Sequence, residues 1–154
     1  QELAKMRNSL AFTLLELLLT FIIIGTLTTI AASTYSGYMD RSKSAQAKSD
    51  IFLIESKIEI FYSINSRYPE SLDELKGQIP LDPWGNPYQY LNITTAKGKG
   101  KVRKDHNLVP LNSDYDLYSM GKDGKSVSPL TAKASRDDIV RANNGAFVGL
   151  ASEY

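Results

Sequence analysis

The sequence predicts an α+β protein in which one long N-terminal helix packs on a small antiparallel sheet. Residues 12–32 form an almost unbroken apolar run, and residues 33–64 continue without a proline, with apolar side chains at helical spacing. Two short tyrosine-rich segments follow, at residues 88–93 and 115–120, and turn-forming residues separate them from the helix. A long helical pattern followed by strands indicates an α+β fold.

Length and composition limit the class of protein. After the apolar run, roughly 120 of the 154 residues remain, which is enough for one small domain with a modest core. The 18 basic and 17 acidic residues give a net charge of +1, so no overall field attracts polyanions, and we expect no specific nucleic-acid partner. The chain has no cysteine, which excludes disulfides and cysteine-based metal sites. Stability must come from packing, assembly or a hard metal ion.

The apolar run FTLLELLLTFIIIGTLTTIAA occupies residues 12–32 and carries a single carboxylate, Glu16. A helix of about 20 residues spans roughly 30 Å, the hydrocarbon thickness of a bilayer. Leucines and isoleucines cover every direction around its axis, whereas a core helix of a soluble domain shows a polar stripe. We therefore expect residues 12–35 to form a transmembrane helix that only lipid or other helices surround, and residues 36–154 to form the globular domain.

The helix is expected to continue as an amphipathic second half from Ser33 to about Ile64. Apolar side chains recur there at steps of three or four residues and form a stripe that can pack on a sheet: Ile51, Ile54, Ile58 and Phe61. Leu53 and Ile60 lie outside this stripe, so we expect the helix to be covered on more than one side. Pro69 ends the helix, since the residue before a proline avoids the α-helical region.

Short elements follow the helix. Ser71 and Glu74 are spaced as in a capping box and predict one capped turn of helix. Residues 88–93 and 115–120 are the two predicted strands, and residues 97–104 between them predict a solvated hairpin tip.

Two features of the second half of the chain point to other chemistry. The predicted tip is basic and contains Lys97, Lys99, Lys101, Arg103 and Lys104. Phosphate contacts would let these residues touch DNA, but no aromatic residue interrupts them to stack on a base, so a solvated tip is the preferred interpretation. No catalytic arrangement can be tied to the single histidine, His106, and we expect a solvated loop residue and no enzyme.

The start of the apolar run carries a recognisable motif. Ala11 is followed by Phe12, Thr13, two leucines and Glu16, and this order resembles the prepilin signature of type IV pilins and type II secretion pseudopilins. The resemblance implies that prepilin peptidase cuts between Ala11 and Phe12 and that the new N-terminal amine is methylated. It also implies that Glu16 pairs with the N-terminus of a neighbouring subunit, in keeping with the cost of an unpaired carboxylate in an apolar segment.

Two positions remain open for the mature N-terminus. A cut before Phe12 makes residues 1–11 a leader, whose basic residues fit the cytoplasmic side of a membrane. A cut before Gln1 leaves residues 1–11 as an N-terminal extension, and Glu16 then needs another cation. The alternative interpretation of the whole segment is a signal anchor with a stray glutamate.

Two later segments extend the resemblance. DPWGNPYQY at residues 82–90 and DYDLYSMGKDG at residues 114–124 are similar to segments that frame the small sheet of the major pseudopilin of type II secretion systems. The resemblance implies a pilin-like fold and a structural subunit that polymerises through its N-terminal helix into a secretion pseudopilus, which helps to export folded proteins. Such a subunit lies in the bacterial inner membrane before assembly and in a periplasmic or extracellular filament afterwards. Its implied partners are further copies of itself, prepilin peptidase, minor pseudopilins or pilins, and the assembly platform.

Other functions remain open. The loop at residues 125–136 is longer than usual for that family, and the tail RDDIVRANNGAFVGLASEY at residues 136–154 departs from its short tail. The major subunit of a surface type IV pilus, acting in adhesion, motility or DNA uptake, is therefore the alternative. A membrane-tethered binding domain that never polymerises is a second alternative, but a simple tether does not need Glu16.

The sequence Gly-Lys-Asp-Gly at residues 121–124 is a candidate cation site. Asp123 on one side and Asp137 with Asp138 on the other flank a loop that must return on itself, so their carboxylates can converge. The resemblance implies one Ca²⁺ ion, held by the carbonyls of Met120, Lys125 and Ser135 and the side chains of Asp123 and Asp137, with Asp138 as a substitute. We expect this ion to order the loop. Aspartates that serve only as turn formers and caps are the alternative.

Overall fold

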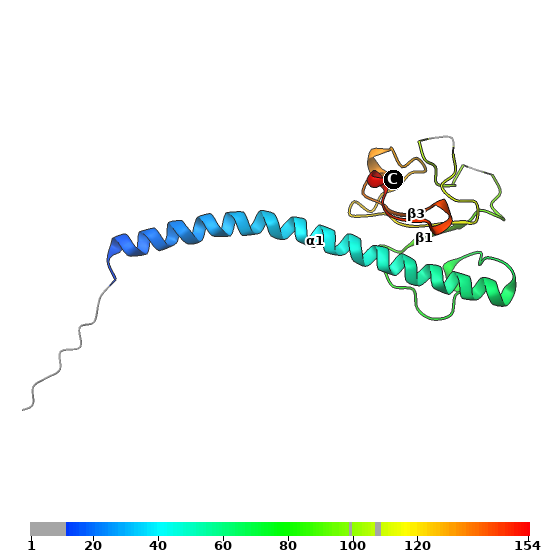
Figure 1. Cartoon of the computed structure of the whole chain (residues 1–154), viewed down its shortest axis with the longest axis horizontal. Helices are drawn as coiled ribbons and strands as arrows, with labels where there is room; N and C mark the ends of the chain where they lie inside the picture. The colour runs from blue at the N-terminus through cyan, green and yellow to red at the C-terminus, as the bar shows by residue number, and fades with distance from the viewer. Residues whose placement is uncertain (1–11, 99, 107–108) are drawn as a thin grey trace, which may run out of the picture. The chain divides into compact units, whose positions relative to one another are not determined.

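The computed structural model describes residues 12–98, 100–106 and 109–154, so residues 1–11 lie outside the described residues. The chain divides into two compact units, one that ends at Met39 and one from Asp40 to Tyr154. Helix α1 (Leu14–Asn65) contributes to both units (Figure 1). The prediction of one long N-terminal helix is confirmed.

The N-terminal half of α1 has an apolar surface that its own unit leaves uncovered. Between residues 14 and 30, the exposed fraction of the large apolar side chains ranges from 47% at Ile23 to 82% at Leu14. The helix is long and apolar enough to cross a membrane. Its threonine hydroxyls donate to helix carbonyls, as Thr20 does to Leu17 at 2.8 Å, so they need no partner in lipid. The predicted helix with an apolar surface on every side is thus confirmed.

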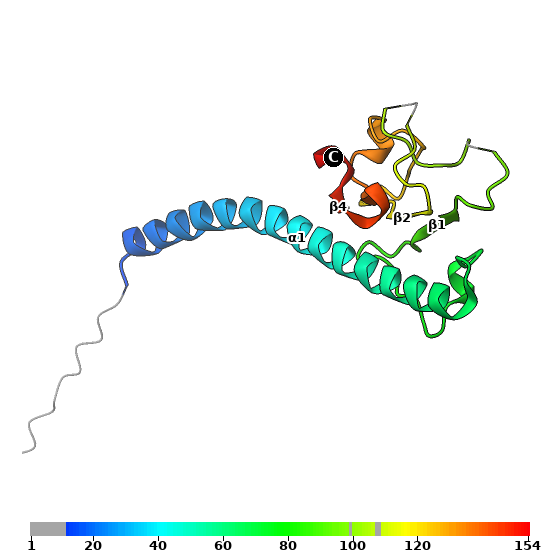
Figure 2. The same cartoon turned by 45° about the vertical axis from the view of Figure 1, so that its right-hand side comes forward.

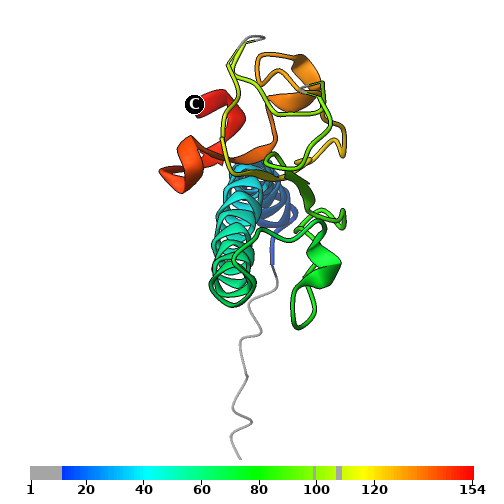
Figure 3. The ribbon, with the colours of Figure 1, turned by 90° about the vertical axis from the view of Figure 1, so that its right-hand side faces the viewer.

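The C-terminal half of α1 packs on the sheet through the predicted stripe. Ile51, Ile54 and Ile58 are fully buried and Phe61 is partly buried, in a core that they share with sheet residues such as Leu117. Figure 3 looks along this helix and shows the strands on one side of it. The spacing of three and four residues therefore identified the buried face correctly.

The other side of this half is open within the described chain. Leu53 is 50% exposed and Ile60 is 58% exposed. The expectation that the helix is covered on more than one side is therefore wrong for the isolated chain, because this small domain offers the helix only one sheet face.

Four antiparallel strands form one sheet in the chain order β1-β2-β3-β4 (Figure 2). Strands β1 (Gln89–Asn92) and β2 (Tyr115–Ser119) correspond to the two predicted strands. Strand β3 (Ile139–Ala142) pairs with β2 and with β4 (Phe147–Leu150). The α+β prediction is confirmed, and strands that are neighbours in sequence are neighbours in the sheet.

The C-terminal tail forms β3 and β4, two strands that its sequence pattern did not predict. All four residues of β3 are buried, so this strand lacks the alternation that marks a half-exposed strand, and its Arg141 further obscures the pattern. A signal was present in the connection to β4. Asn143, Asn144 and Gly145 adopt positive φ angles of 52°, 53° and 93°, and such residues are typical of tight turns between antiparallel strands.

The face of the sheet that points away from α1 carries a smaller core. Val140 and Ala142 point there because side chains alternate along a strand, and they pack with Leu111, Leu130 and Ala151. Leu130 belongs to the loop between β2 and β3. This loop is thereby part of the packed domain.

The remaining short elements are 3₁₀ turns: η1 (Leu72–Glu74), η2 (Lys133–Ser135), η3 (Asn143–Gly145) and η4 (Ala151–Glu153). Ser71 makes no side-chain cap hydrogen bond at η1, so the predicted capping box is wrong. The carboxylate of Glu74 instead accepts the backbone N–H of Glu70 at 2.6 Å and pairs with Arg67 at 2.7 Å. The turn is stabilised from the residues before it.

The connection between β1 and β2 differs from the predicted solvated hairpin tip at two basic residues. Arg103 is only 2% exposed, and its backbone N–H donates to the buried carboxylate of Asp116 at 2.7 Å. Lys104 is half-buried, and its backbone bridges to Pro110 and Pro129. The prediction of a solvated tip is therefore wrong at these two residues, whereas Lys97 and Lys101 are exposed as expected and Lys99 lies outside the described residues.

Candidate assembly and ion-binding sites

A capping box fixes the carboxylate of Glu16 at the start of α1. The backbone N–H and the hydroxyl of Thr13 donate to Glu16 Oε2 at 2.9 and 3.0 Å. In return, the backbone N–H of Glu16 donates to Thr13 Oγ1 at 3.2 Å. Thr13 is therefore the N-cap residue of a helix that begins at Leu14. The sequence signal was the threonine three residues before the glutamate, and the sequence analysis did not use it.

Phe12 directly precedes this cap and is 79% exposed. A cut before Phe12 places the new amine next to the N-cap residue Thr13. Ala11, the other half of the predicted cleavage pair, lies outside the described residues. The structure thus places Phe12 and Glu16 at the same end of the helix.

The two motif segments of the globular domain contact each other. Asp82 accepts the backbone N–H groups of Trp84 and Asn86 at 3.1 and 2.8 Å and so closes the turn of the DPWGNPY segment. The hydroxyl of Ser119, at the end of β2, donates to Asp82 at 2.6 Å and accepts the N–H of Gly121 at 3.1 Å. These contacts fix the position at which the Gly-Lys-Asp-Gly turn leaves the sheet.

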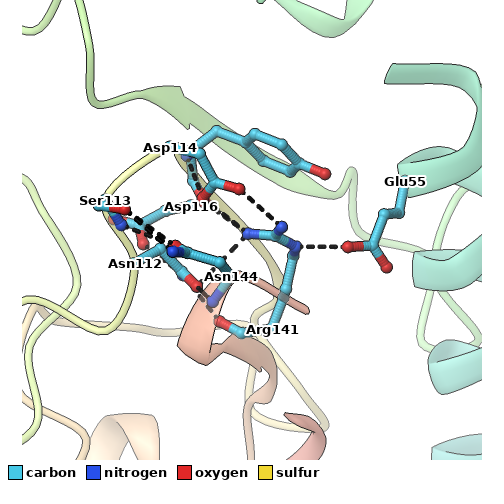
Figure 4. Close-up of polar contacts among 8 residues, drawn as sticks. Glu55, Asn112, Ser113, Asp114, Asp116, Arg141 and Asn144 are labelled. Carbon is cyan, nitrogen blue, oxygen red and sulfur yellow. Dashed lines mark hydrogen bonds and ion pairs between the residues drawn. The ribbon is translucent and has the colours of Figure 1, made fainter. Parts of the chain in front are cut away.

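A buried guanidinium joins α1 to the sheet (Figure 4). Arg141 of β3 is 2% exposed and donates from Nε to Glu55 of α1 at 2.7 Å. Its two Nη atoms donate to both carboxylate oxygens of Asp114 at 2.9 and 2.8 Å, and its guanidinium stacks 4.1 Å from the ring centre of Tyr115. Burial alone lowers the pKa of Arg141, but the hydrogen bonds with Asp114 and Glu55 outweigh it and raise the pKa. The group is a permanent cation between two carboxylates.

A layer of amides surrounds this ion pair. Asn112 donates to Asp116 at 3.0 Å and to the carbonyl of Arg141 at 3.0 Å, and it accepts the N–H of Asn144 at 2.9 Å. A Cβ atom at Gly145 would lie 2.4 Å from the carboxylate of Glu55, so the turn after β3 requires glycine there. The network holds the helix, the sheet and the β3–β4 turn together, and the exposed hydroxyl of Ser113 contacts Asn144 at its edge.

The structure brings Asp123 and Asp137 together. The backbone N–H of Asp123 donates to Asp137 Oδ2 at 3.0 Å, and Asp123 Oδ1 accepts the N–H of Lys125 at 2.8 Å. Gly121 has a φ angle of 64°, and a Cβ atom there would lie 2.2 Å from the carbonyl oxygen of Asp137. Only glycine at this position lets the main chain of Asp137 approach the turn. Met120 and Lys125 flank the turn on either side.

Ser135 and Asp138 have protein partners of their own. The hydroxyl of Ser135 donates to the carbonyl of Val127 at 2.8 Å and accepts its N–H at 2.9 Å, while the carbonyl of Ser135 accepts the N–H of Asp138 at 3.3 Å. Asp138 is fully buried, and its Oδ2 accepts Nη2 of Arg103 and the hydroxyl of Ser126, both at 2.5 Å. Burial raises the pKa of Asp138 to about 6, against the opposing contacts with Ser126 and Arg103.

His106 is a solvated loop residue. Its side chain is 81% exposed, and Nδ1 lies 2.5 Å from the carboxylate of Asp105. The pair borders an open pocket that Thr131 and Ser152 also line, and no hydrogen bond joins the imidazole to either hydroxyl in the described residues.

The chain matches no family model, but it is similar over most of its length to known proteins. It is 31% identical over 127 residues to the type II secretion system core protein G of Xanthomonas campestris pv. campestris, and the alignment covers 73% of this chain and 78% of that protein. The chain belongs to this family of major pseudopilins. Relatives of the same name in Pseudomonas aeruginosa and Aeromonas hydrophila are 29% identical over 140 and 141 residues, covering 77% and 78% of this pseudopilin and 87% of each relative.

A solved structure is also similar to this pseudopilin. It is the major pseudopilin from the type 2 secretion system of enterohaemorrhagic Escherichia coli, with 25% sequence identity and a TM-score of 0.45. The likeness covers 68% of this pseudopilin and 90% of that chain.

The residues of this pseudopilin fit a calcium ion in part. The carboxylate of Asp137 contacts the backbone N–H of Asp123, and the main chain of Asp137 occupies the room that a side chain at Gly121 would take. Within the described part of the chain, no group of three or more histidine, aspartate or glutamate side chains is placed to hold a metal. A bound ion would therefore depend on main-chain carbonyls in addition to these two carboxylates, which Ca²⁺ accepts readily.

Proposed function

We propose that this pseudopilin is a structural subunit that polymerises through α1 into a type II secretion pseudopilus and so helps to export folded proteins. The observation that carries the proposal is the exposed apolar surface of the N-terminal half of α1, where Leu14 is 82% and Phe21 is 71% exposed. Each large apolar side chain that stays in water loses about 1.5–3 kcal/mol of stabilisation that burial would give. Such a helix needs lipid or other helices on all sides.

The bacterial inner membrane is the reservoir for this helix before assembly, and copies of the same helix replace the lipid in the periplasmic or extracellular filament. Exchanging lipid for leucine and isoleucine side chains changes the apolar contribution little, because both surroundings are apolar. Polar groups therefore decide whether the helix is more stable in the membrane or in the filament. A carboxylate inside the membrane is costly when it is unpaired, and it is stabilised in the filament if Glu16 binds a cation of the next subunit.

The cation proposed for Glu16 is the N-terminal amine of a neighbouring Phe12. Prepilin peptidase creates this amine by cutting between Ala11 and Phe12, and methylation keeps it positively charged. The remaining partners proposed are the assembly platform, which extracts the subunit from the membrane, and minor pseudopilins. Support comes from family membership and from the position of Phe12 and Glu16 at one end of the helix.

The features that suggested a surface type IV pilus as the alternative belong to the small domain itself. They were the longer loop at residues 125–136 and the unusual C-terminal tail at residues 136–154. The tail supplies β3 and β4 of the sheet, and the loop places Leu130 in the smaller core.

The charge of Glu16 gives the experiment that tests the proposal. Glu16→Gln keeps an oxygen that can accept the N–H of Thr13, so the capping box survives, but the charge is lost. We expect this variant to insert into the membrane normally and to fail in filament formation and in export of a folded protein, because the neighbouring amine is left unpaired.

Thr13→Val is the matched control. It removes the hydroxyl of the capping box and keeps the carboxylate, so filaments should still form. Electron microscopy of sheared filaments and a secretion assay provide the readouts. Normal filaments from Glu16→Gln, or loss of filaments only in Thr13→Val, would show that capping and not charge pairing is the role of this end of the helix.

A further inference from the structure

The loop between β2 and β3 is anchored by one buried guanidinium, that of Arg103. Nη2 of Arg103 donates to Asp138 Oδ2 at 2.5 Å, at the end of the loop. Nη1 donates to the carbonyl of Val127 at 2.6 Å and to the hydroxyl of Ser126, near the start of the loop. The side chains of Arg103 and Asp138 are 3% and 0% exposed. One cation thus gathers a carboxylate, a hydroxyl and a carbonyl from both ends of the loop.

The sheet holds this guanidinium in place. The backbone N–H of Arg103 donates to Asp116 of β2 at 2.7 Å, and the guanidinium carbon lies 4.2 Å from the ring centre of Tyr118, also in β2. A cation over an aromatic face is attracted to it, and the attraction increases when the pair is withdrawn from water. Strand β2 therefore fixes the position of the Arg103 charge beneath the loop.

Further contacts hold the middle of the loop in place, and neither Asp123 nor Asp137 takes part in them. Leu130 is 4% exposed, and its N–H donates to the carbonyl of Lys104 at 3.0 Å. The N–H of Lys104 donates to the carbonyl of Ser128 at 2.9 Å. Lys104 therefore binds the middle of the loop, and Arg103 binds both of its ends.

We propose that Arg103 is the resident cation that orders this loop, so that the loop at residues 125–136 is folded without a bound metal ion. A hard cation such as Ca²⁺ orders a loop by collecting carboxylate and carbonyl oxygens, and the fixed fork of a guanidinium collects the same groups with directed hydrogen bonds. A calcium ion at Asp123 and Asp137 then acts on the preceding turn alone. This inference replaces the expectation that the ion orders the whole loop.

The inference also assigns Asp138 a different role from its neighbour. Asp138 is the counter-ion of Arg103: the contacts with Arg103 and Ser126 occupy its Oδ2, while its buried Oδ1 has no hydrogen-bond partner among the described residues. Asp138 is thus bound to a cation of the chain itself, whereas Asp137 contacts the turn at Asp123.

Hydrogen exchange of the full chain in detergent micelles tests this inference, measured by mass spectrometry on peptides that cover residues 126–135. With the wild type, the ratio of exchange in this segment to exchange in the core strand at residues 115–119 should be the same in millimolar Ca²⁺ and in excess EGTA, because this ratio removes any change in global stability. Arg103→Met should raise the exchange rate by at least about a hundredfold in both conditions, because Asp138 is left buried without its cation. Arg67→Met, which removes an exposed ion pair with Glu74, is the matched control and should leave the segment unchanged.

Arg103→Lys keeps a charge beside Asp138 but loses the fork that reaches Ser126 and Val127, so it should give an intermediate rate. If Arg103→Met does not fold, the wild-type comparison and the lysine variant decide the question. Deprotection of the wild-type segment by EGTA beyond that of the core strand at residues 115–119 would overturn the inference, and so would a segment that stays protected in Arg103→Met or in Arg103→Lys. The readout does not involve filaments, so it stands apart from the proposed function.

Discussion

Glu16 has two partners in this account, one in its own chain and one in the next subunit. In the isolated chain its carboxylate accepts the N–H and the hydroxyl of Thr13 at 2.9 and 3.0 Å. A carboxylate near a helix N-terminus is also favoured by the helix dipole. The cap keeps the charge in a defined position at the end of the helix, where the amine proposed as its partner can reach it.

Processing at the same end of the helix gives the first prediction. Subunits recovered from filaments should begin at Phe12 and carry one N-methyl group, because only a cut at that bond frees the amine proposed to pair with Glu16. Intact mass spectrometry of the filament subunit measures both changes together. Subunits that retain residues 1–11 would contradict this prediction and favour the upstream cut.

Arg141 gives a prediction about stability. Arg141→Met leaves Glu55 and Asp114 partly buried without their cation, so the unfolding free energy of residues 36–154 should fall by about 3 kcal/mol. Those residues contain the compact unit from Asp40 to Tyr154 with its own core. Urea denaturation followed by circular dichroism measures the change.

An exposed ion pair in the same domain is the control for Arg141. The side chains of Arg67 and Glu74 are 52% and 30% exposed, and Arg67→Met should change the unfolding midpoint little, since water screens such pairs. Equal effects of the two substitutions would show that the Arg141 network is no more important than a surface pair.

Single residues differ in how well the sequence predicted them. Phe12 and Glu16 could be named as candidate processing and assembly residues because their signature is local, and their roles stay predictions. Arg141 and Arg103 were missed because their partners are distant: Glu55 is 86 positions from Arg141, and Asp138 is 35 positions from Arg103. A single basic residue in a sequence is normally predicted to be exposed to solvent. Only the folded structure shows that it lies beside a buried carboxylate.

Among the elements, the turn at residues 121–124 gives the prediction about metal. If Asp123 and Asp137 bind Ca²⁺ with main-chain carbonyls, binding to the folded state stabilises it by RT ln(1 + [Ca²⁺]/Kd), about 2.7 kcal/mol at a hundredfold excess over Kd. EGTA should therefore lower the melting temperature of residues 36–154, and Ca²⁺ should restore it. Mg²⁺ should substitute poorly, because it requires a tighter octahedral shell and keeps its waters.

Asp123→Ala should blunt the calcium response, since it removes one of the two carboxylates. Asp73→Ala, at an exposed acidic residue of η1, is the matched control and should melt like the wild type in both conditions. A wild type whose melting is indifferent to EGTA and to millimolar Ca²⁺ would reduce Asp123 and Asp137 to turn-forming residues.

Elements with a clear period were predicted well, and elements without one were not. The helix was found from its apolar run and from Ile51, Ile54 and Ile58, and the first two strands from their tyrosine-rich pattern between turns. Strand β3 was missed because both of its faces are buried, one by α1 and one by the smaller core. Periodicity shows a half-exposed element, and it gives no signal when both sides are covered.

For the whole molecule, the account joins a helix that needs apolar surroundings to a domain that folds around its own core. The compact unit from Asp40 to Tyr154 has buried apolar cores of its own, whereas the helix before Met39 exposes its large apolar side chains. The helix before Met39 therefore depends on lipid or on other subunits for its apolar surroundings, and the cores of the compact unit form within the chain. This division is what a subunit stored in a membrane and displayed on a filament requires.

The most direct test is the accessibility of the helix in assembled filaments. The chain has no cysteine, so a single cysteine introduced at Leu18, which is 57% exposed in the isolated chain, can be followed with a water-soluble maleimide. The account predicts that Leu18→Cys stays unlabelled in sheared, membrane-free filaments and is labelled once detergent dissociates them, while Lys97→Cys on the exposed surface is labelled in both. Labelling of Leu18→Cys in intact filaments would contradict the claim that copies of α1 pack together at the filament core.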